Sequence, residues 1–244
     1  MFMTIYRRAF SVLMKKPLKL WGISLLSILL SGVLGGLCGF AIPGLSLAVG
    51  LLIGTSMTVI FLRGYRGEDV NTAMLFECFK DWKTIKRVLG GLGWMYLWVF
   101  LWSLIPIVGP FIAMVRMYEY RLTPYILVFE PDVPITEAIK VSKQKTNGYK
   151  LQMFLADFVY LVAFWVAVLI LALLAGIEYI GVLFGLILAI LYIVFVALAP
   201  LFAGLVQAAF YEEISGVNVK HCSGCGEVLP EGAAFCARCG KSVE

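Results

Sequence analysis

The chain has 244 residues, of which 61% are hydrophobic and 14% are charged, and its formal net charge at pH 7 is +5. A mean hydropathy of +0.94 lies well outside the range of soluble globular domains, so the composition excludes that class and predicts an integral membrane protein. Four of the six cysteines fall in the last 25 residues, which argues against an exported disulfide scaffold.

Residues 1–17 are predicted to form an amphipathic helix that lies in the lipid headgroup layer. Apolar side chains recur there at helical spacing, and basic residues occupy the other side of the helix. The apolar side chains are those of Phe2, Ile5, Tyr6, Ala9, Phe10 and Leu13. No small-residue cleavage site follows the first apolar run, so we expect this run to be retained rather than removed as a signal peptide.

The sequence predicts an all-α membrane domain over residues 18–210, in which six helices cross the bilayer as three hairpins. Each stretch is at least 18 residues long, which is close to or above the length of about 20 residues that crosses a hydrocarbon core of roughly 30 Å. The expected spans are residues 18–42, 45–62, 88–105, 106–129, 151–175 and 179–210. The first contains two small-xxx-small pairs, Gly32 with Gly36 and Gly35 with Gly39, which allow close backbone approach to another helix.

Two connectors carry amphipathic patterns. In residues 63–87, apolar residues recur on one face of a second interfacial helix. These residues are Leu75, Phe79, Trp82 and Ile85. In the connector after residue 129, one face of a short helix carries Ile135, Ala138, Ile139 and Ser142, with lysines pointing away. That face could rest on anionic lipid headgroups, although a simple basic connector is the more economical interpretation.

The stretch 106–129 decides the topology. If it crosses the bilayer, every basic connector lies on one side, and the turns near residues 43, 108 and 178 on the other side contain no lysine or arginine. Basic connectors of membrane proteins stay in the cytoplasm. We therefore expect a multi-pass protein of the cell membrane with both termini in the cytoplasm.

Three charges make the stretch 106–129 costly to insert by itself, namely Arg116, Glu119 and Arg121. Arg116 and Glu119 are three residues apart, so they share one helix face. Arg121 lies at a depth similar to that of Asp157 on the next span, which predicts an ion pair between them. We expect these four residues to form a paired charged cluster inside the bundle.

A resemblance to an uncharacterised bacterial family of multi-pass membrane proteins, a domain of unknown function, rests on short motifs around the fourth span. The motifs are Tyr125-Ile126-Leu127, Glu137-Ala138-Ile139, Ser142 and Gly148-Tyr149-Lys150. That family is distantly similar to the membrane domains attached to some glycerophosphodiester phosphodiesterases. The family usually ends its third span with Ile-Pro-Gly, whereas this chain has Ile105-Pro106-Ile107-Val108-Gly109-Pro110. The resemblance implies a multi-pass helical fold and carries no activity, and the chain contains no phosphodiesterase catalytic domain.

The segment 222–244, which follows a linker at 211–221, has the cysteine spacing of a metal site. Two CxxC pairs are separated by ten residues and supply four thiolates, the ligand set of a closed structural zinc site. The four ligands are Cys222, Cys225, Cys236 and Cys239. Two disulfides are the competing interpretation, and the cytoplasmic placement of the tail favours metal. Gly226 and Gly240 each follow the second cysteine of a pair, where a tight turn favours positive φ.

The tail resembles the short zinc ribbons at the ends of many prokaryotic membrane proteins, and the likeness extends through Leu229-Pro230 and Phe235. His221 is adjacent to a site that four cysteines already complete, so we interpret it as a bystander. Basic and acidic residues balance in the tail, which argues against a nucleic-acid partner. The expected partners are the bilayer and a cytoplasmic protein bound by the ribbon.

Three functions remain open from the sequence. The first is a non-enzymatic membrane protein whose cytoplasmic ribbon binds a partner or senses metal or redox state. The second is a transporter or channel-like protein that uses the charged cluster, since charges inside a membrane are functional candidates. The third, an intramembrane enzyme, has the weakest support, because no HExxH motif, histidine in a span or phosphate-binding glycine loop is present.

Overall fold

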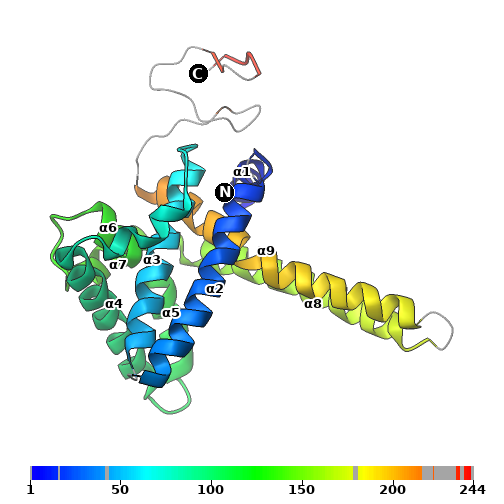
Figure 1. The fold of residues 1–244 in the computed structure, drawn as a ribbon, viewed down its shortest axis with the longest axis horizontal. Helices are drawn as coiled ribbons and strands as arrows, with labels where there is room; N and C mark the ends of the chain where they lie inside the picture. Colours follow the sequence, from blue (N-terminus) through cyan, green and yellow to red (C-terminus); the bar gives the residue numbers. More distant parts are fainter. Residues whose placement is uncertain are drawn as a thin grey trace.

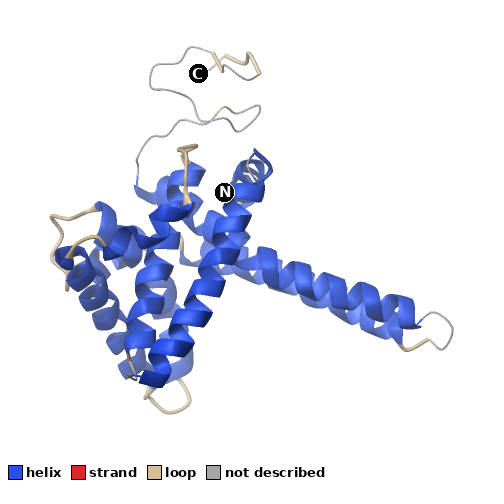
Figure 2. Cartoon of the chain, in the orientation of Figure 1, coloured by secondary structure: helices blue, strands red, loops and turns tan. Residues whose placement is uncertain are grey.

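The computed structural model describes residues 2–15, 17–41, 44–177, 181–215, 222, 235–236 and 239–242. These residues form helices joined by turns (Figure 2). The β pairing within this part of the chain is one isolated antiparallel bridge between Phe235 and Ser242. The predicted all-α fold class is therefore confirmed for the described membrane domain.

The helices follow one another as α1 (Phe2–Lys15), α2 (Pro17–Ala41), α3 (Leu45–Tyr65), the 3-10 helix η1 (Thr72–Phe79), α4 (Trp82–Ser103), α5 (Gly109–Glu119), α6 (Thr123–Phe129), α7 (Ala138–Lys145), α8 (Lys150–Ala175) and α9 (Gly181–Ser215). Four of them, α2, α3, α8 and α9, are long and apolar enough to cross a membrane. These four helices confirm the membrane character predicted from the composition.

The four long helices form two hairpins that diverge from each other. Helices α2 and α3 lie side by side, and Gly44, with φ of 97°, starts the second of them. Helices α8 and α9 pack along each other through stacked rings such as those of Phe164 and Phe195, whose centroids are 3.5 Å apart. Figure 1 shows the α8–α9 hairpin projecting away from α2 to α5. The described helices therefore do not form a single parallel bundle.

The stretch 106–129 is not one continuous helix, contrary to our expectation. It contains α5 and α6, whose 11 and 7 residues rise only about 16 Å and about 10 Å along their axes. Pro124 lies in the first turn of α6 and has no N–H to donate to the Tyr120 carbonyl. Helix α5 therefore ends at Glu119 and does not continue into α6. The charged residues expected in mid-helix lie at this break.

The largest buried core lies where α1, α3 and α6 meet the last third of α9. Tyr125 of α6 stacks on Tyr211 of α9 with ring centroids 4.5 Å apart, and Phe210 is buried beside them. Helix α1 forms over nearly the predicted residues, but Ile5 and Ala9 of its apolar face, which was expected to meet lipid headgroups, are buried in this core. Helix α9 contains Pro200 and continues to Ser215, five residues into the segment expected as a linker.

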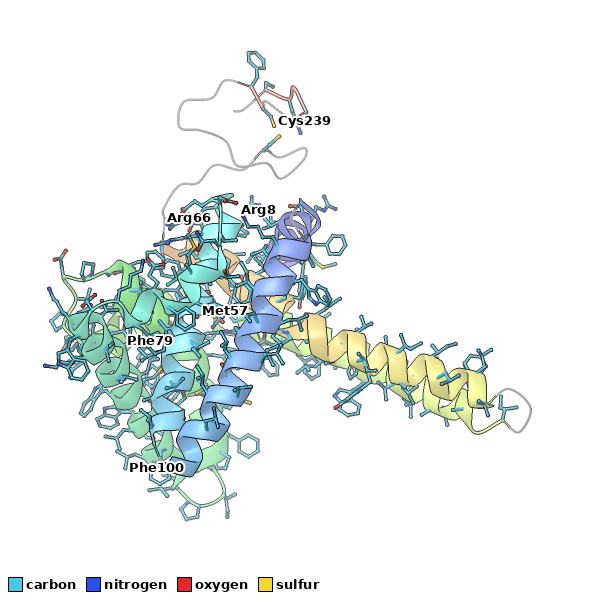
Figure 3. The ribbon with its side chains drawn as sticks, viewed as in Figure 1. Arg8, Met57, Arg66, Phe79, Phe100 and Cys239 are labelled. Carbon is cyan, nitrogen blue, oxygen red and sulfur yellow. The ribbon has the colours of Figure 1, made fainter. Side chains whose placement is uncertain are left out.

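Ion pairs between α9 and two earlier helices support this extension of α9. The Arg66 side chain lies 3.0 Å from the Glu212 carboxylate, and Arg8 lies 3.1 Å from Glu213. Figure 3 shows Arg8 and Arg66 at the same end of the molecule. The end of α9 is thus fixed to α1 and to the end of α3.

The connector between α3 and α4 does not form the single amphipathic helix that the pattern predicts. Asp81 interrupts it, because its carboxylate accepts a hydrogen bond of 2.7 Å from the Thr84 N–H and caps α4. Leu75 is buried in the core, whereas Trp82 is 66% exposed. The apolar residues of the pattern therefore face different environments.

Cys78 is buried in η1, where it packs into the hydrophobic core. Burial raises the pKa of the Cys78 thiol, so little reactive thiolate forms near neutral pH. We expect iodoacetamide at pH 8 to alkylate Cys78 at least about tenfold more slowly than a cysteine introduced at the exposed Ala73 of the same helix. Site-resolved mass spectrometry measures both rates, and equal rates would contradict the buried position.

The pair Gly32 with Gly36 of the first span makes no close helix contact within the described chain, and neither does Gly35, while the surroundings of Gly39 lie outside what the structure describes. Nothing lies within 4 Å of a methyl group placed on Gly32, Gly35 or Gly36. Close approach occurs elsewhere, since Gly204 of α9 faces the Phe61 ring of α3 and Gly91 of α4 faces Leu127 of α6. These contacts hold α9 and α6 against their neighbours.

Replacing Gly204 with alanine is expected to destabilise the protein by about 1–3 kcal/mol, because the new methyl group overlaps the rigid Phe61 ring. Gly185→Ala is the matched control, since it lies in the same helix with nothing within 4 Å. Thermal unfolding in detergent measures the difference between the two variants. An equal midpoint for both would contradict the close packing of α3 on α9.

Candidate metal centre and charged cluster

Three of the four predicted metal ligands come together in the C-terminal tail. The sulfur atoms of Cys222, Cys236 and Cys239 all lie within 4.8 Å of one another, and the Sγ atoms of Cys222 and Cys239 are 3.4 Å apart. Figure 3 shows Cys239 in this tail. Cys225, Gly226, His221 and the motif Leu229-Pro230 lie outside the described residues.

The second CxxC pair lies on a tight turn of the type that the glycine predicts. The N–H of Gly240 donates to the Cys236 carbonyl, and the N–H of Cys236 donates to the Lys241 carbonyl, both at 2.9 Å. Gly240 has φ of 72°, a conformation that other residues adopt at a cost. The bridge between Phe235 and Ser242 closes the turn. This backbone holds Cys236 and Cys239 close together.

The sulfur separations fit coordination to one metal ion. A tetrahedral zinc with Zn–S bonds of about 2.3 Å holds its sulfurs about 3.8 Å apart, which lies between the 3.4 Å that separates Cys222 and Cys239 and the 4.8 Å within which all three sulfurs lie. A disulfide would bring two sulfurs to about 2.05 Å, so Cys222 and Cys239 are not placed as a bonded pair. The donors are thiolates, the ligands that soft and borderline metals prefer.

The charged cluster consists of two separate groups. In the first, Glu119 at the end of α5 is 4% exposed and contacts two cations. Its carboxylate accepts a hydrogen bond of 2.5 Å from Arg116 and one of 2.6 Å from Lys150, the first residue of α8. Arg116 was predicted to belong to this cluster, whereas Lys150 was not. Its position at the start of the next long helix was the available signal.

In the second group, the expected pair between Arg121 and Asp157 is present and is bidentate. The two guanidinium nitrogens lie 2.5 and 3.1 Å from the two carboxylate oxygens, and the Tyr118 hydroxyl donates to Asp157 at 3.1 Å. Asp157 is seven residues into α8, roughly 10 Å from its start. Two facing hydrogen bonds give this pair a defined geometry.

Helix α7 caps the break between α5 and α6. The hydroxyls of Ser142 and Thr146 donate to the Glu119 carbonyl at 2.7 and 3.1 Å, and the Leu122 N–H donates to Ser142 at 3.2 Å. Helix ends need such partners when they are buried. The face of α7 that was expected to rest on lipid headgroups or to belong to a simple basic connector packs against the protein instead, since Ala138 and Ser142 are fully buried.

Arg87 holds the end of α6 against the start of α4. Its guanidinium donates to the carbonyls of Leu127, Glu130 and Val133 at 2.8, 2.7 and 2.6 Å. This role of Arg87 was not predicted, because its three acceptors lie 40 or more residues away in the sequence. These bonds place residues 127–133 level with the first turns of α4.

A cavity of about 430 Å³ opens beside the second charged group. Its wall includes Met95, Met114, Met117, Tyr118, Arg121 and Asp157. It also includes Gln207 of α9, whose amide donates to the Arg121 carbonyl at 3.4 Å. The cavity therefore lies at the junction of α4 and α5 with the α8–α9 hairpin. Glu119 is not part of the lining.

Comparisons of the chain with protein-family models, with curated proteins and with solved structures find no match.

Proposed function

We propose that the chain is a non-enzymatic integral membrane protein whose cytoplasmic tail binds structural zinc and presents a ribbon to a partner protein or senses metal or redox state. The observation that carries this proposal is the gathering of Cys222, Cys236 and Cys239 within 4.8 Å at the end of a chain of apolar helices. The resemblance to multi-pass membrane proteins with terminal zinc ribbons agrees with it.

Zinc is the metal that the ligand set favours. Cys225 completes four thiolates by its spacing from Cys222, and Cys₄ sites of this spacing are structural rather than catalytic. A segment this short buries too little apolar surface to fold on its own. Zinc bound by the four cysteines would hold the turn at 236–241 and supply the folding energy of the tail.

Six crossings with both termini in the cytoplasm remain our proposal for the topology. Helix α5 begins just after α4 ends, and Arg87 ties the end of α6 to the start of α4. The broken element therefore returns along the length of α4, so α5 and α6 complete a crossing if α4 makes one. In this arrangement the basic connectors share one side, which supports a reducing environment for the cysteines.

The alternative, a transporter or channel-like protein, gains partial support from the cavity. The cavity reaches Arg121 and Asp157, which would give a polar ligand a partner inside the membrane domain. Glu119, by contrast, is buried and held by Arg116 and Lys150. A cavity on one side of paired charges supports a binding site more directly than a continuous pathway.

The test compares the full-length protein with its Cys222→Ser, Cys225→Ser variant after crosslinking in membranes. We expect about one zinc per chain in the wild type, none in the variant, and the loss of specific crosslinked proteins from the variant. Cys78→Ser is the control, because it removes a cysteine outside the tail. Retention of zinc by the variant, or an identical set of crosslinked proteins, would overturn the proposal.

A further inference from the structure

The cavity beside Arg121 and Asp157 combines a charged pair with an apolar wall. Met114 and Met117 are 45% and 42% exposed and line the opening, while Met95 is buried at the back. Methionine side chains adapt to flexible apolar groups. Asp157 and Gln207 come from the two longest apolar helices, so the site borders the region that lipid chains would occupy.

The charged pair retains hydrogen-bonding capacity toward the cavity. A guanidinium has five N–H donors, and Asp157 accepts two of those of Arg121. The Arg121 and Asp157 side chains are 17% and 29% exposed. Polar atoms that face hydrocarbon carry a high cost, so the exposed part of the pair needs a polar occupant.

The charges of the wall select the kind of occupant. Arg121 and Asp157 neutralise each other, so the site offers no net attraction to a simple anion or cation. An occupant that carries both charges can place an anionic group on Arg121 and a cationic group on Asp157. The Tyr118 ring already carries the Arg121 guanidinium, 5.4 Å from its centroid, and the Tyr120 ring in the cavity wall is the aromatic group left to attract an ammonium group.

We infer that this cavity binds a zwitterionic phospholipid, with its phosphate at Arg121, its ammonium at Asp157 and acyl chains along the methionines. Phosphate oxygens are acceptors that match the remaining guanidinium donors. The apolar opening favours a lipid over a soluble phosphate compound. This binding site is independent of the zinc tail and goes beyond the function proposed above.

Native mass spectrometry of the delipidated full-length protein tests the inference. The probes are palmitoyl-oleoyl phosphatidylethanolamine, the anionic palmitoyl-oleoyl phosphatidylglycerol and soluble phosphoethanolamine. We expect one phosphatidylethanolamine per chain, bound at least about fivefold more tightly than phosphatidylglycerol, and no comparable binding of phosphoethanolamine. Equal binding of both lipids would overturn the charge argument, and equal binding of phosphoethanolamine would overturn the lipid assignment.

Two double substitutions, each of which neutralises one ion pair, provide a test variant and its matched control. Arg121→Gln with Asp157→Asn removes the charges of the cavity, and we expect it to abolish the preference for phosphatidylethanolamine. Lys145→Gln with Glu130→Gln removes a pair of similar exposure outside the cavity, at 26% and 28%, and should leave the preference unchanged. A preference that survives in the first variant, or that disappears in both, would overturn the assignment.

A space-filling variant keeps the inference testable if the neutral pair fails to fold. Met114→Trp fills the opening and should lower lipid binding at least about fivefold. Val115→Trp alters the next residue of α5, which is 47% exposed and lies outside the cavity wall, and should bind as the wild type does. Equal lipid binding by the two tryptophan variants would place the lipid elsewhere.

Discussion

Chelation of zinc is expected to unfold the C-terminal tail and to leave the helical domain unchanged. A segment this short buries too little apolar surface to fold on its own, and structural zinc contributes about 10–16 kcal/mol of apparent binding energy in segments of this size. The amide protons of Cys236 and Gly240, which are hydrogen-bonded in the turn, should then exchange at the rate of an unfolded chain. Hydrogen exchange with mass spectrometry on the detergent-solubilised protein measures this loss.

The controls for chelation distinguish metal from disulfides. Added zinc should restore protection of the turn, and magnesium should not, because magnesium prefers oxygen ligands. Circular dichroism at 222 nm should show that the helices persist throughout. If a reductant removed the protection and a chelator did not, the tail would be held by disulfides and the zinc assignment would be wrong.

The Asp157→Asn substitution is expected to destabilise the membrane domain by roughly 3 kcal/mol, at the lower end of the cost of breaking a buried ion pair because both partners keep some exposure. The change removes one carboxylate and leaves the Arg121 guanidinium with a neutral amide at a depth where an unpaired charge is costly. Unfolding by a denaturing detergent, followed by the loss of helical signal, measures the effect.

Rescue by a second substitution separates the pair from general damage to α8. Arg121→Gln in the Asp157→Asn background should recover part of the loss, since no unpaired charge remains. The double-mutant cycle should show a coupling energy of at least about 1 kcal/mol. A coupling near zero would show that the hydrogen bonds between Arg121 and Asp157 do not contribute to stability.

The sequence predicts those features that depend on local spacing or on depth in the membrane. The pair between Arg121 and Asp157 follows from counting residues to the expected ends of neighbouring helices. The conformation of Gly240 follows from its place after a CxxC pair. The one-sided apolar face of α7 follows from the spacing of its residues, although its burial against the protein was not predicted. In each case the information lies within a short stretch of sequence, as a residue count, a motif position or a helical spacing.

Features that depend on hydrogen-bond partners far away in the sequence could not be predicted in this way. The break at Pro124 is stable because Ser142 and Thr146 donate to the Glu119 carbonyl, and no local pattern reveals those bonds. Arg87 likewise has acceptors 40 to 46 residues away. The divergence of the two long hairpins depends on packing between whole helices, which hydrophobicity alone does not specify.

The capping of the α5–α6 break by α7 has a consequence for biogenesis. During synthesis the ribosome delivers Glu119 to the translocon well before Ser142, so the nascent chain holds an uncapped carbonyl until some 23 further residues have emerged. The fourth hydrophobic stretch should therefore stay in a loosely held intermediate until the chain passes Lys150, whose ammonium group then reaches Glu119. We therefore expect residues 106–129 to reach their final arrangement only after the later residues up to Lys150 have been synthesised.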